Sequence, residues 1–70
     1  MKMKIKLQMY FTDIEVGNYY SVSRFTIWRW VREGKFPHPL KLSSGSSRWH
    51  RSDLEQHDEK VRRQNELVEV

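Results

Sequence analysis

The chain is 70 residues long, which allows one domain with a small core. It contains no cysteine, so neither a disulfide framework nor a cysteine zinc site can reinforce that core. No apolar run reaches the length of a membrane span, and the lysine-rich N-terminus lacks the apolar block of a signal peptide. We therefore expect a cytoplasmic protein with no membrane partner.

The positive charge is concentrated in the middle of the chain. Residues 21–51 contain seven basic side chains and one acidic one, whereas residues 52–70 contain three basic and six acidic ones. The whole chain carries a net charge of +4. A central cationic region predicts a polyanionic partner, and nucleic acid is the interpretation that we favour. The alternative is an ordinary solvated basic surface.

The first predicted element is a short strand within residues 3–11. Its apolar side chains alternate with polar ones, at Met3, Ile5, Leu7, Met9 and Phe11. A period of two is typical of a strand with one buried face. The competing interpretation is a frayed cationic tail, because chain termini are often disordered.

A capping box predicts where the first helix begins. Thr12 is followed three residues later by Glu15, the spacing at which each side chain can bond the other's backbone N–H. We expect a short helix from Asp13, weakened by Gly17, and a turn over residues 18–23.

The second predicted helix runs from Arg24 to Glu33. Ser23 is its N-cap candidate, and Gly34 stands where a left-handed residue commonly ends a helix. Pro37 and Pro39 prevent the helix from continuing. Two helices joined by a short turn, the second of them basic, predict a helix-turn-helix.

The rest of the chain predicts a hairpin and a third helix. The segment L-K-L, then S-S-G-S-S, then R-W-H is typical of two short strands around a flexible turn. Ser52 and Glu55 repeat the capping-box spacing, so a third helix should run from Asp53 into the sixties. We divide the chain into an N-terminal strand or arm at 1–11, a domain at 12–66 and a frayed end at 67–70.

Helical periodicity gives the second helix two different faces. Ile27, Trp30 and Val31 share one face, which should pack against the first helix. Phe25 lies on the opposite face, with Trp28 on the flank. The open alternative for these two aromatic residues is that they pack under the hairpin or the N-terminal strand.

Arg29 and Arg32 share the outward face with Phe25. Arginine donates to guanine edges and phosphates, and apolar side chains contact thymine methyl groups. The free N–H groups at a helix N-terminus, here beside Ser23, suit a phosphate oxygen. This face therefore has the chemistry of a helix that enters the major groove.

One long run of residues matches a known family pattern. It is S-R-F-T-I-W-R-W-V-R-E-G-K-F-P-H-P-L-K-L followed by R-W-H-R-S-D-L-E, within residues 12–57. In this run the chain resembles the AlpA family of prophage regulators, which belong with excisionase-like and MerR-like winged helix-turn-helix domains. The resemblance implies an α+β fold in which a helix-turn-helix is followed by a two-stranded β-hairpin wing and a C-terminal helix. A short N-terminal strand can precede them.

The resemblance also implies a function. It is that of a sequence-specific transcriptional regulator of a prophage or mobile element, with residues 23–33 in the major groove of double-stranded DNA and hairpin 40–50 as the wing. The expected DNA-binding residues are Ser23, Arg24, Phe25, Thr26, Trp28, Arg29, Arg32, Lys35, Lys41, Ser46 and Arg48. An alternative within the family is an excisionase that bends DNA for an integrase. Further copies of the chain could bind beside the first.

Four features depart from the family pattern. Phe25 replaces a small polar residue, and Tyr20-Ser21-Val22 stands where Thr-Gly precedes an apolar residue, which suggests a changed turn geometry. Gly45 lies where the wing tip has an arginine, and His57-Asp58 replaces a Trp-Ile pair. The last departure predicts that the C-terminal helix docks loosely or against another subunit.

Other function classes have less support in the sequence. His38, His50 and His57 lack the spacing of metal ligands, and no nucleophile–base arrangement or glycine-rich phosphate loop is present. We therefore expect no enzyme, no metal, no cofactor and no small-molecule substrate. A second alternative is a protein-interaction module that uses Phe25, Trp28 and the basic face to bind an acidic protein.

Overall fold

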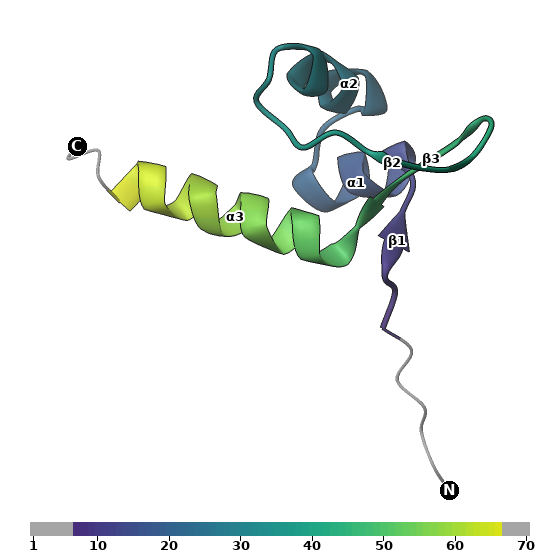
Figure 1. Cartoon of the computed structure of the whole chain (residues 1–70). Helices are drawn as coiled ribbons and strands as arrows, with labels where there is room; N and C mark the ends of the chain where they lie inside the picture. The colour runs from purple at the N-terminus through teal and green to yellow at the C-terminus, as the bar shows by residue number, and fades with distance from the viewer. Residues whose placement is uncertain (1–6, 67–70) are drawn as a thin grey trace, which may run out of the picture.

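The computed structural model describes residues 7–66 and contains three helices and a three-stranded antiparallel sheet. In chain order the elements are β1 (Tyr10–Phe11), α1 (Asp13–Tyr20), α2 (Arg24–Arg32), β2 (Leu40–Ser43), β3 (Ser46–His50) and α3 (Arg51–Glu66), as shown in Figure 1. The strand order is β1-β3-β2, so β3 lies in the centre of the sheet. This arrangement confirms the predicted α+β winged helix-turn-helix fold. No helix within the described residues has the length and apolarity needed to cross a membrane.

The N-terminal strand is shorter than its sequence pattern predicts. Only Tyr10 and Phe11 pair with β3, opposite His50 and Trp49. Immediately before these two residues the strand pairing is replaced by one hydrogen bond, which the Arg51 N–H donates to the Met9 carbonyl at 2.7 Å. Beyond it β1 has no strand to pair with, because β3 ends at His50 and the chain turns into α3. Of the predicted strand, residues 3–6 lie outside the described part of the chain.

The capping box at the start of α1 is confirmed. The Glu15 N–H donates to the Thr12 hydroxyl at 3.1 Å, and the Thr12 N–H donates to the Glu15 carboxylate at 2.9 Å. The helix then continues to Tyr20, so the turn predicted over residues 18–23 is wrong in its first half. Hydroxyl contacts from Tyr19 and Tyr20 to α3, described below, hold this last turn of the helix.

Gly17 permits the close approach between α1 and the turn that follows it. The residue is buried, and a Cβ atom at this position would lie 2.7 Å from the Val22 carbonyl oxygen. The Val22 N–H donates to the Gly17 carbonyl at 2.8 Å. Gly17 weakens the helix in isolation, but the tertiary structure requires it.

The turn between α1 and α2 keeps a left-handed residue without using glycine. Ser21 has φ 60° and ψ 40°, in the left-handed region that residues other than glycine rarely occupy. Ser21 therefore adopts the left-handed conformation that glycine favours, at the position where the sequence predicted a changed turn geometry.

The predicted ends of α2 are confirmed to within one residue. Ser23 is the N-cap, and its hydroxyl accepts the Thr26 N–H at 3.2 Å. Gly34 has φ +75° and donates to the Val31 carbonyl, while the Lys35 N–H donates to the Trp30 carbonyl. These two bonds form the paired closure that commonly ends a helix at glycine.

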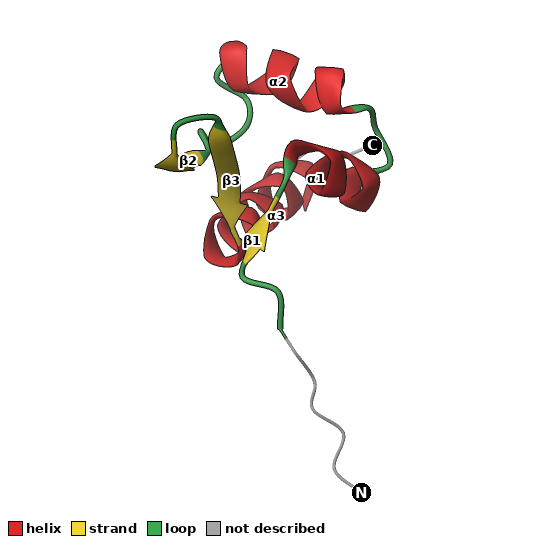
Figure 2. Cartoon of the chain, turned by 90° about the vertical axis from the view of Figure 1, so that its right-hand side faces the viewer, coloured by secondary structure: helices red, strands yellow, loops and turns green. Residues whose placement is uncertain are grey.

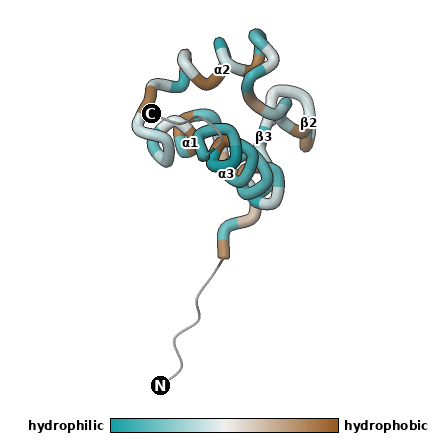
Figure 3. The backbone as a smooth tube through the Cα atoms, turned by 90° about the vertical axis from the view of Figure 1, so that its left-hand side faces the viewer, coloured by the Kyte–Doolittle hydropathy of each residue, from teal (hydrophilic) through white to brown (hydrophobic). Residues whose placement is uncertain are grey.

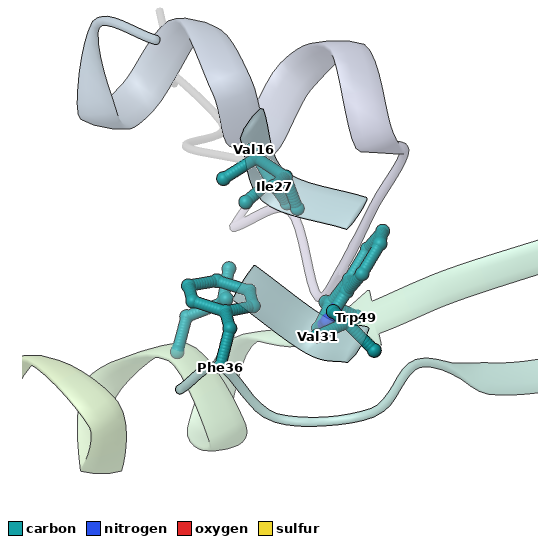
Figure 4. Close-up of a cluster of buried hydrophobic side chains, with 6 residues drawn as sticks. Val16, Ile27, Val31, Phe36 and Trp49 are labelled. Atoms are coloured by element: carbon teal, nitrogen blue, oxygen red, sulfur yellow. The ribbon is translucent and has the colours of Figure 1, made fainter. Parts of the chain in front are cut away.

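The core is built from apolar residues of the three helices, of β3 and of the segment between α2 and β2. Its buried members are Val16, Ile27, Val31, Phe36, Trp49 and Leu54 (Figure 4). Trp49 of β3 is fully buried, and its indole N–H donates to the Pro37 carbonyl at 2.7 Å. The prediction that Trp30 would be a core residue is only partly right. Trp30 is half-buried at the edge of the cluster, with its ring 6.3 Å from that of Phe36.

The third helix begins two residues earlier than predicted. The side chain that bonds its first turn is His50, whose Nδ1 accepts the Ser52 N–H at 3.1 Å, so the predicted capping role of Ser52 is wrong. Most of α3 is hydrophilic (Figure 3), and Leu54 is its buried residue among those described.

Two substituted residues anchor α3 by polar and aromatic contacts. The His57 ring lies 4.6 Å from that of Phe36, and Asp58 accepts hydroxyl bonds from Tyr20 at 2.6 Å and Tyr19 at 3.2 Å. The Tyr20 pKa is raised, first by burial and then by its hydrogen bond to Asp58. The prediction of a loosely docked C-terminal helix thus overlooked this network, which replaces an apolar anchor.

Candidate nucleic-acid interface

Helix α2 is fixed by its inner face and exposes its outer one. Ile27 and Val31 are buried against α1 and the core, and Figures 1 and 2 both place α2 on the side of the fold opposite α3. Phe25, Arg29 and Arg32 follow one another at i, i+4 and i+7, so they form a single stripe along the exposed side. We call these three residues the outer stripe.

The outer stripe has no partner of its own within the described structure. Phe25 is 76% exposed, the largest value among the exposed apolar side chains, and Arg29 and Arg32 are also exposed. No ion pair or side-chain hydrogen bond joins either arginine to another residue in the range 7–66. The two cations and the aromatic ring are therefore available to a ligand.

The first turn of α2 is ordered by its own hydroxyl groups. Ser23 and Thr26 lie with their hydroxyl oxygens 3.1 Å apart, in addition to the capping bond between them. Ser23 is exposed and Thr26 is half-buried. Ser23 and Thr26 lie at the N-terminal end of the outer stripe, where a recognition helix commonly contacts base edges.

Arg24 and Trp28 are bound to α1, unlike the outer stripe. Both reach the same carboxylate oxygen of Asp13, the Arg24 Nη2 at 2.8 Å and the Trp28 indole N–H at 2.8 Å. The Trp28 ring also lies 5.2 Å from that of Trp49 in the hairpin. The outward orientation expected for Trp28 is therefore wrong, and the alternative in which it packs under the hairpin is correct.

The charge of Asp13 is stabilised by these contacts. Burial acts to raise the pKa of this carboxyl group, but hydrogen bonds from Trp28, Arg24 and the backbone of Ile14 outweigh it and lower the pKa. The carboxylate therefore stays ionised near neutral pH and ties the N-terminal ends of α1 and α2 together. Sequence reasoning missed this role, because the spacing of Asp13 from its partners has no local signature.

The hairpin carries the remaining predicted contacts. Lys41 is exposed on β2, while Ser46 and Arg48 are half-buried on β3. The Arg48 guanidinium donates to the Ser47 carbonyl at 2.9 Å, and its charge helps to lower the Glu15 pKa, whose first cause is the Thr12 backbone N–H. Arg48 therefore lies at the base of the wing beside α1.

The wing tip is polar and tightly turned. Ser43 pairs with Ser46 across a two-residue turn in which Gly45 has φ +79°. The register shifts between Lys41 and Ser43, so β2 has a bulge there. Figure 1 shows the hairpin projecting from the rest of the fold.

Lys35 stands apart from both surfaces. It follows the C-terminus of α2 and forms an exposed ion pair with Glu33 at 3.5 Å, an interaction that contributes little free energy in water. Of the predicted residues, six belong to α2 and Ser23 is its N-cap, whereas Lys35 follows the helix and the other three lie in the hairpin. Within α2, Arg24 and Trp28 contact α1 and do not belong to the outer stripe. No group of three metal-ligating side chains lies together within residues 7–66.

The comparisons with known proteins agree with this geometry. The family model of a helix-turn-helix domain matches residues 10–60, which includes α1, α2, the hairpin and the first part of α3. The chain belongs to this helix-turn-helix domain family. The family is typical of small AlpA-like and excisionase-like regulators, so the resemblance drawn from the sequence is confirmed at this level. Neither the curated proteins nor the solved structures compared with the chain include a significant match.

Membership of the helix-turn-helix domain family supports DNA binding. In such domains the second helix of the pair enters the major groove. Here that helix is α2, which also carries the outer stripe.

Proposed function

We propose that this helix-turn-helix domain is a sequence-specific transcriptional regulator of a prophage or mobile element. Helix α2, within residues 23–33, would lie in the major groove, and the hairpin at 40–50 would touch the neighbouring backbone or minor groove. The observation that carries the proposal is the outer stripe, in which two arginines and one phenylalanine are exposed on a helix whose other face is buried.

The distribution of charge supports one orientation on DNA. Six of the seven basic side chains of residues 21–51 belong to α2, the hairpin and the segment between them, and the seventh, Arg51, begins α3, which carries most of the acidic residues. Since α3 lies on the side opposite α2 (Figures 1 and 2), the acidic helix would face away from the phosphates. Electrostatic steering would then favour approach with α2 first.

The proposed contacts divide into two kinds. Arg29 and Arg32 can donate to guanine edges or phosphates, and Ser23 with the free N–H groups of the first turn suits a phosphate oxygen. Lys41 and Arg48 would contact the backbone from the wing. Arg24 and Trp28 would act indirectly, because Asp13 already holds them.

The test is DNA selection followed by charge-matched variants. Duplexes bound by the wild-type protein are enriched from a random pool, and affinities for the selected duplex are measured by fluorescence anisotropy at fixed salt. Arg29→Ala should weaken binding by about 1–3 kcal/mol, as expected for the loss of an arginine that reads a base. Arg62→Ala removes one positive charge from the exposed side of α3 and should change the affinity less than twofold. Equal losses in both variants would contradict the proposal.

An excisionase role remains the alternative within the same family, because one short recognition helix reads few base pairs and would suit cooperative binding of several copies to repeats. The two roles differ in their partners. An excisionase would bend the selected DNA and increase excision by an integrase encoded nearby, whereas a regulator would change transcription from an adjacent promoter without an integrase. Assays of excision and of promoter activity on the same fragment distinguish them.

A further inference from the structure

Phe25 is the one residue of the outer stripe that cannot form a hydrogen bond. It occupies the second position of α2, directly after Arg24, and 76% of its surface is exposed. Within the described residues no aromatic ring pairs with it, although Trp28 on the same helix packs against Trp49. The fold therefore gains almost nothing from an aromatic side chain here.

The position of Phe25 places it at the end of the helix that meets bases. The N-terminal residues of a recognition helix commonly contact base edges, and its outer neighbours here are Ser23 and Arg29. The outer stripe extends over eight residues, and the seven steps between its ends rise about 10 Å at 1.5 Å per residue, close to three base-pair steps of about 3.4 Å. Phe25 and Arg29 are four residues apart, about 6 Å, so they would face base pairs no more than two steps apart.

The chemistry of the major groove leaves one favourable partner for a phenyl ring. Guanine and adenine present acceptors there, and cytosine and adenine present amino donors, all of which would lose water without gaining a hydrogen bond. The C5-methyl group of thymine is the apolar group on these edges, and burying it against a phenyl ring removes apolar surface of both from water.

We propose that Phe25 is a specificity-determining residue that reads the C5-methyl group of a pyrimidine within two base steps of a guanine bound by Arg29. This inference rests on the proposed function and makes it more specific. The methyl group can belong to thymine or to 5-methylcytosine, which present the same C5 substituent.

The test removes only that methyl group. In the duplex selected by the wild-type protein, each thymine is replaced in turn by deoxyuridine, which leaves base pairing unchanged. We expect one replacement to weaken binding by about fourfold, the effect of one buried methyl group. Phe25→Ala should bind the thymine and uracil duplexes equally, and Phe25→Leu should recover part of the preference. Val61→Ala on α3, an apolar truncation outside the outer stripe, should keep the full preference.

A second selection identifies the source of the methyl group. A pool in which every cytosine is 5-methylated would enrich either thymine or 5-methylcytosine at one position within two steps of the guanine, and either result supports methyl reading. Thermal melts of the variants confirm folding, which the exposure of Phe25 should preserve.

The possible failures are separable. If the wild-type protein enriches no sequence, the proposed function itself fails. If it enriches a sequence that depends on Arg29 but tolerates uracil at every thymine, or if Phe25→Ala keeps the thymine preference, methyl reading is overturned alone. Unchanged DNA affinity of Phe25→Ala would also overturn it and would assign the ring to a protein partner.

Discussion

The helix pair α1–α2 and the β2–β3 hairpin are attached to the fold in different ways. The helices meet along their length, through the close approach at Gly17, the buried Val16 and Ile27, and the bonds that Asp13 accepts from α2. The hairpin has one buried residue, Trp49, and every residue of β2 is exposed. A helix pair that is held at many points presents fixed side chains to the DNA bases. A hairpin that is held only where it joins the fold can adapt to the shape of the DNA backbone.

The largest expected effect comes from removing the hairpin's single buried anchor. Trp49→Ala should cost about 3–5 kcal/mol, which is most of the stability of a domain this small. Because Trp49 also contacts Trp28 and Phe36, we expect the helix pair to unfold together with the hairpin. Circular dichroism should show no cooperative thermal transition.

Trp30→Ala is the matched control for Trp49. Its ring is half-buried at the edge of the cluster, so the variant should remain folded with a lowered melting temperature. A Trp49→Ala protein that melts above the Trp30→Ala protein would show that the hairpin and the helix pair are stabilised independently.

The second prediction addresses the close contact within the helix pair. Gly17→Ala would place a methyl group 2.7 Å from the Val22 carbonyl oxygen, so the turn must move. We expect a loss of about 2 kcal/mol, since overpacking of this kind outweighs the helix-forming advantage of alanine. Urea titration gives the value, and DNA affinity should fall as well because α2 shifts.

Asn18→Ala provides the control for Gly17→Ala. It is the next residue of the same helix but is exposed, so alanine should be neutral or slightly stabilising. If Gly17→Ala is as stable as Asn18→Ala, the close approach between α1 and the turn is not a constraint on the fold.

The third prediction concerns pH and tests the support shared by the two regions. His57 packs on Phe36, which lies between α2 and the hairpin, and burial lowers the His57 pKa below 6.5 despite the opposing charge of Asp58. The unfolded chain therefore binds the proton more readily than the folded one. The contribution of His57 to the free energy of unfolding is fully present above pH 6.5. It should decline as the pH falls from 6.5 to the lower pKa that His57 has in the folded state.

Urea midpoints measured at pH 7.5 and near pH 5.5 test this effect. The wild-type midpoint should be lower at the acidic pH, and His57→Gln should reduce the difference. His38→Gln is the control, because His38 is exposed and in the described structure makes no aromatic contact. A difference that persists in His57→Gln but disappears in His38→Gln would assign the pH dependence to His38 and would contradict the prediction.

Local signals in the sequence were enough to locate most elements. Thr12 with Glu15, Ser23 and Gly34 each act within one helical turn, so their spacing alone predicted the capping contacts that the structure contains. The outward position of Phe25 also followed from periodicity. The roles of these residues on DNA stay predictions, because they depend on a ligand.

Tertiary contacts account for what the sequence could not give. Trp28 and Trp30 differ by two positions, but an indole N–H acceptor at Asp13 and an aromatic neighbour at Trp49 decide which of them packs under the hairpin. Likewise Ser52 has the spacing of a cap, but β3 runs directly into α3 and leaves His50 in that place. Helical periodicity cannot predict either contact. The partners of Trp28 are distant in the chain, and the capping contact of His50 depends on where β3 ends.

The smallest expected effect lies in the turn that joins the two helices. Ser21 holds a left-handed conformation that costs a serine about 1 kcal/mol and costs glycine almost nothing. Ser21→Gly should therefore stabilise the domain, but by only about 0.5 kcal/mol, because glycine also increases the freedom of the unfolded chain. The melting temperature should rise by about 2–4 °C. Ser43→Gly, in a strand and without positive φ, should lower it instead. If both variants lose stability, Ser21 is not strained, and the helix pair keeps its geometry through its packing contacts alone.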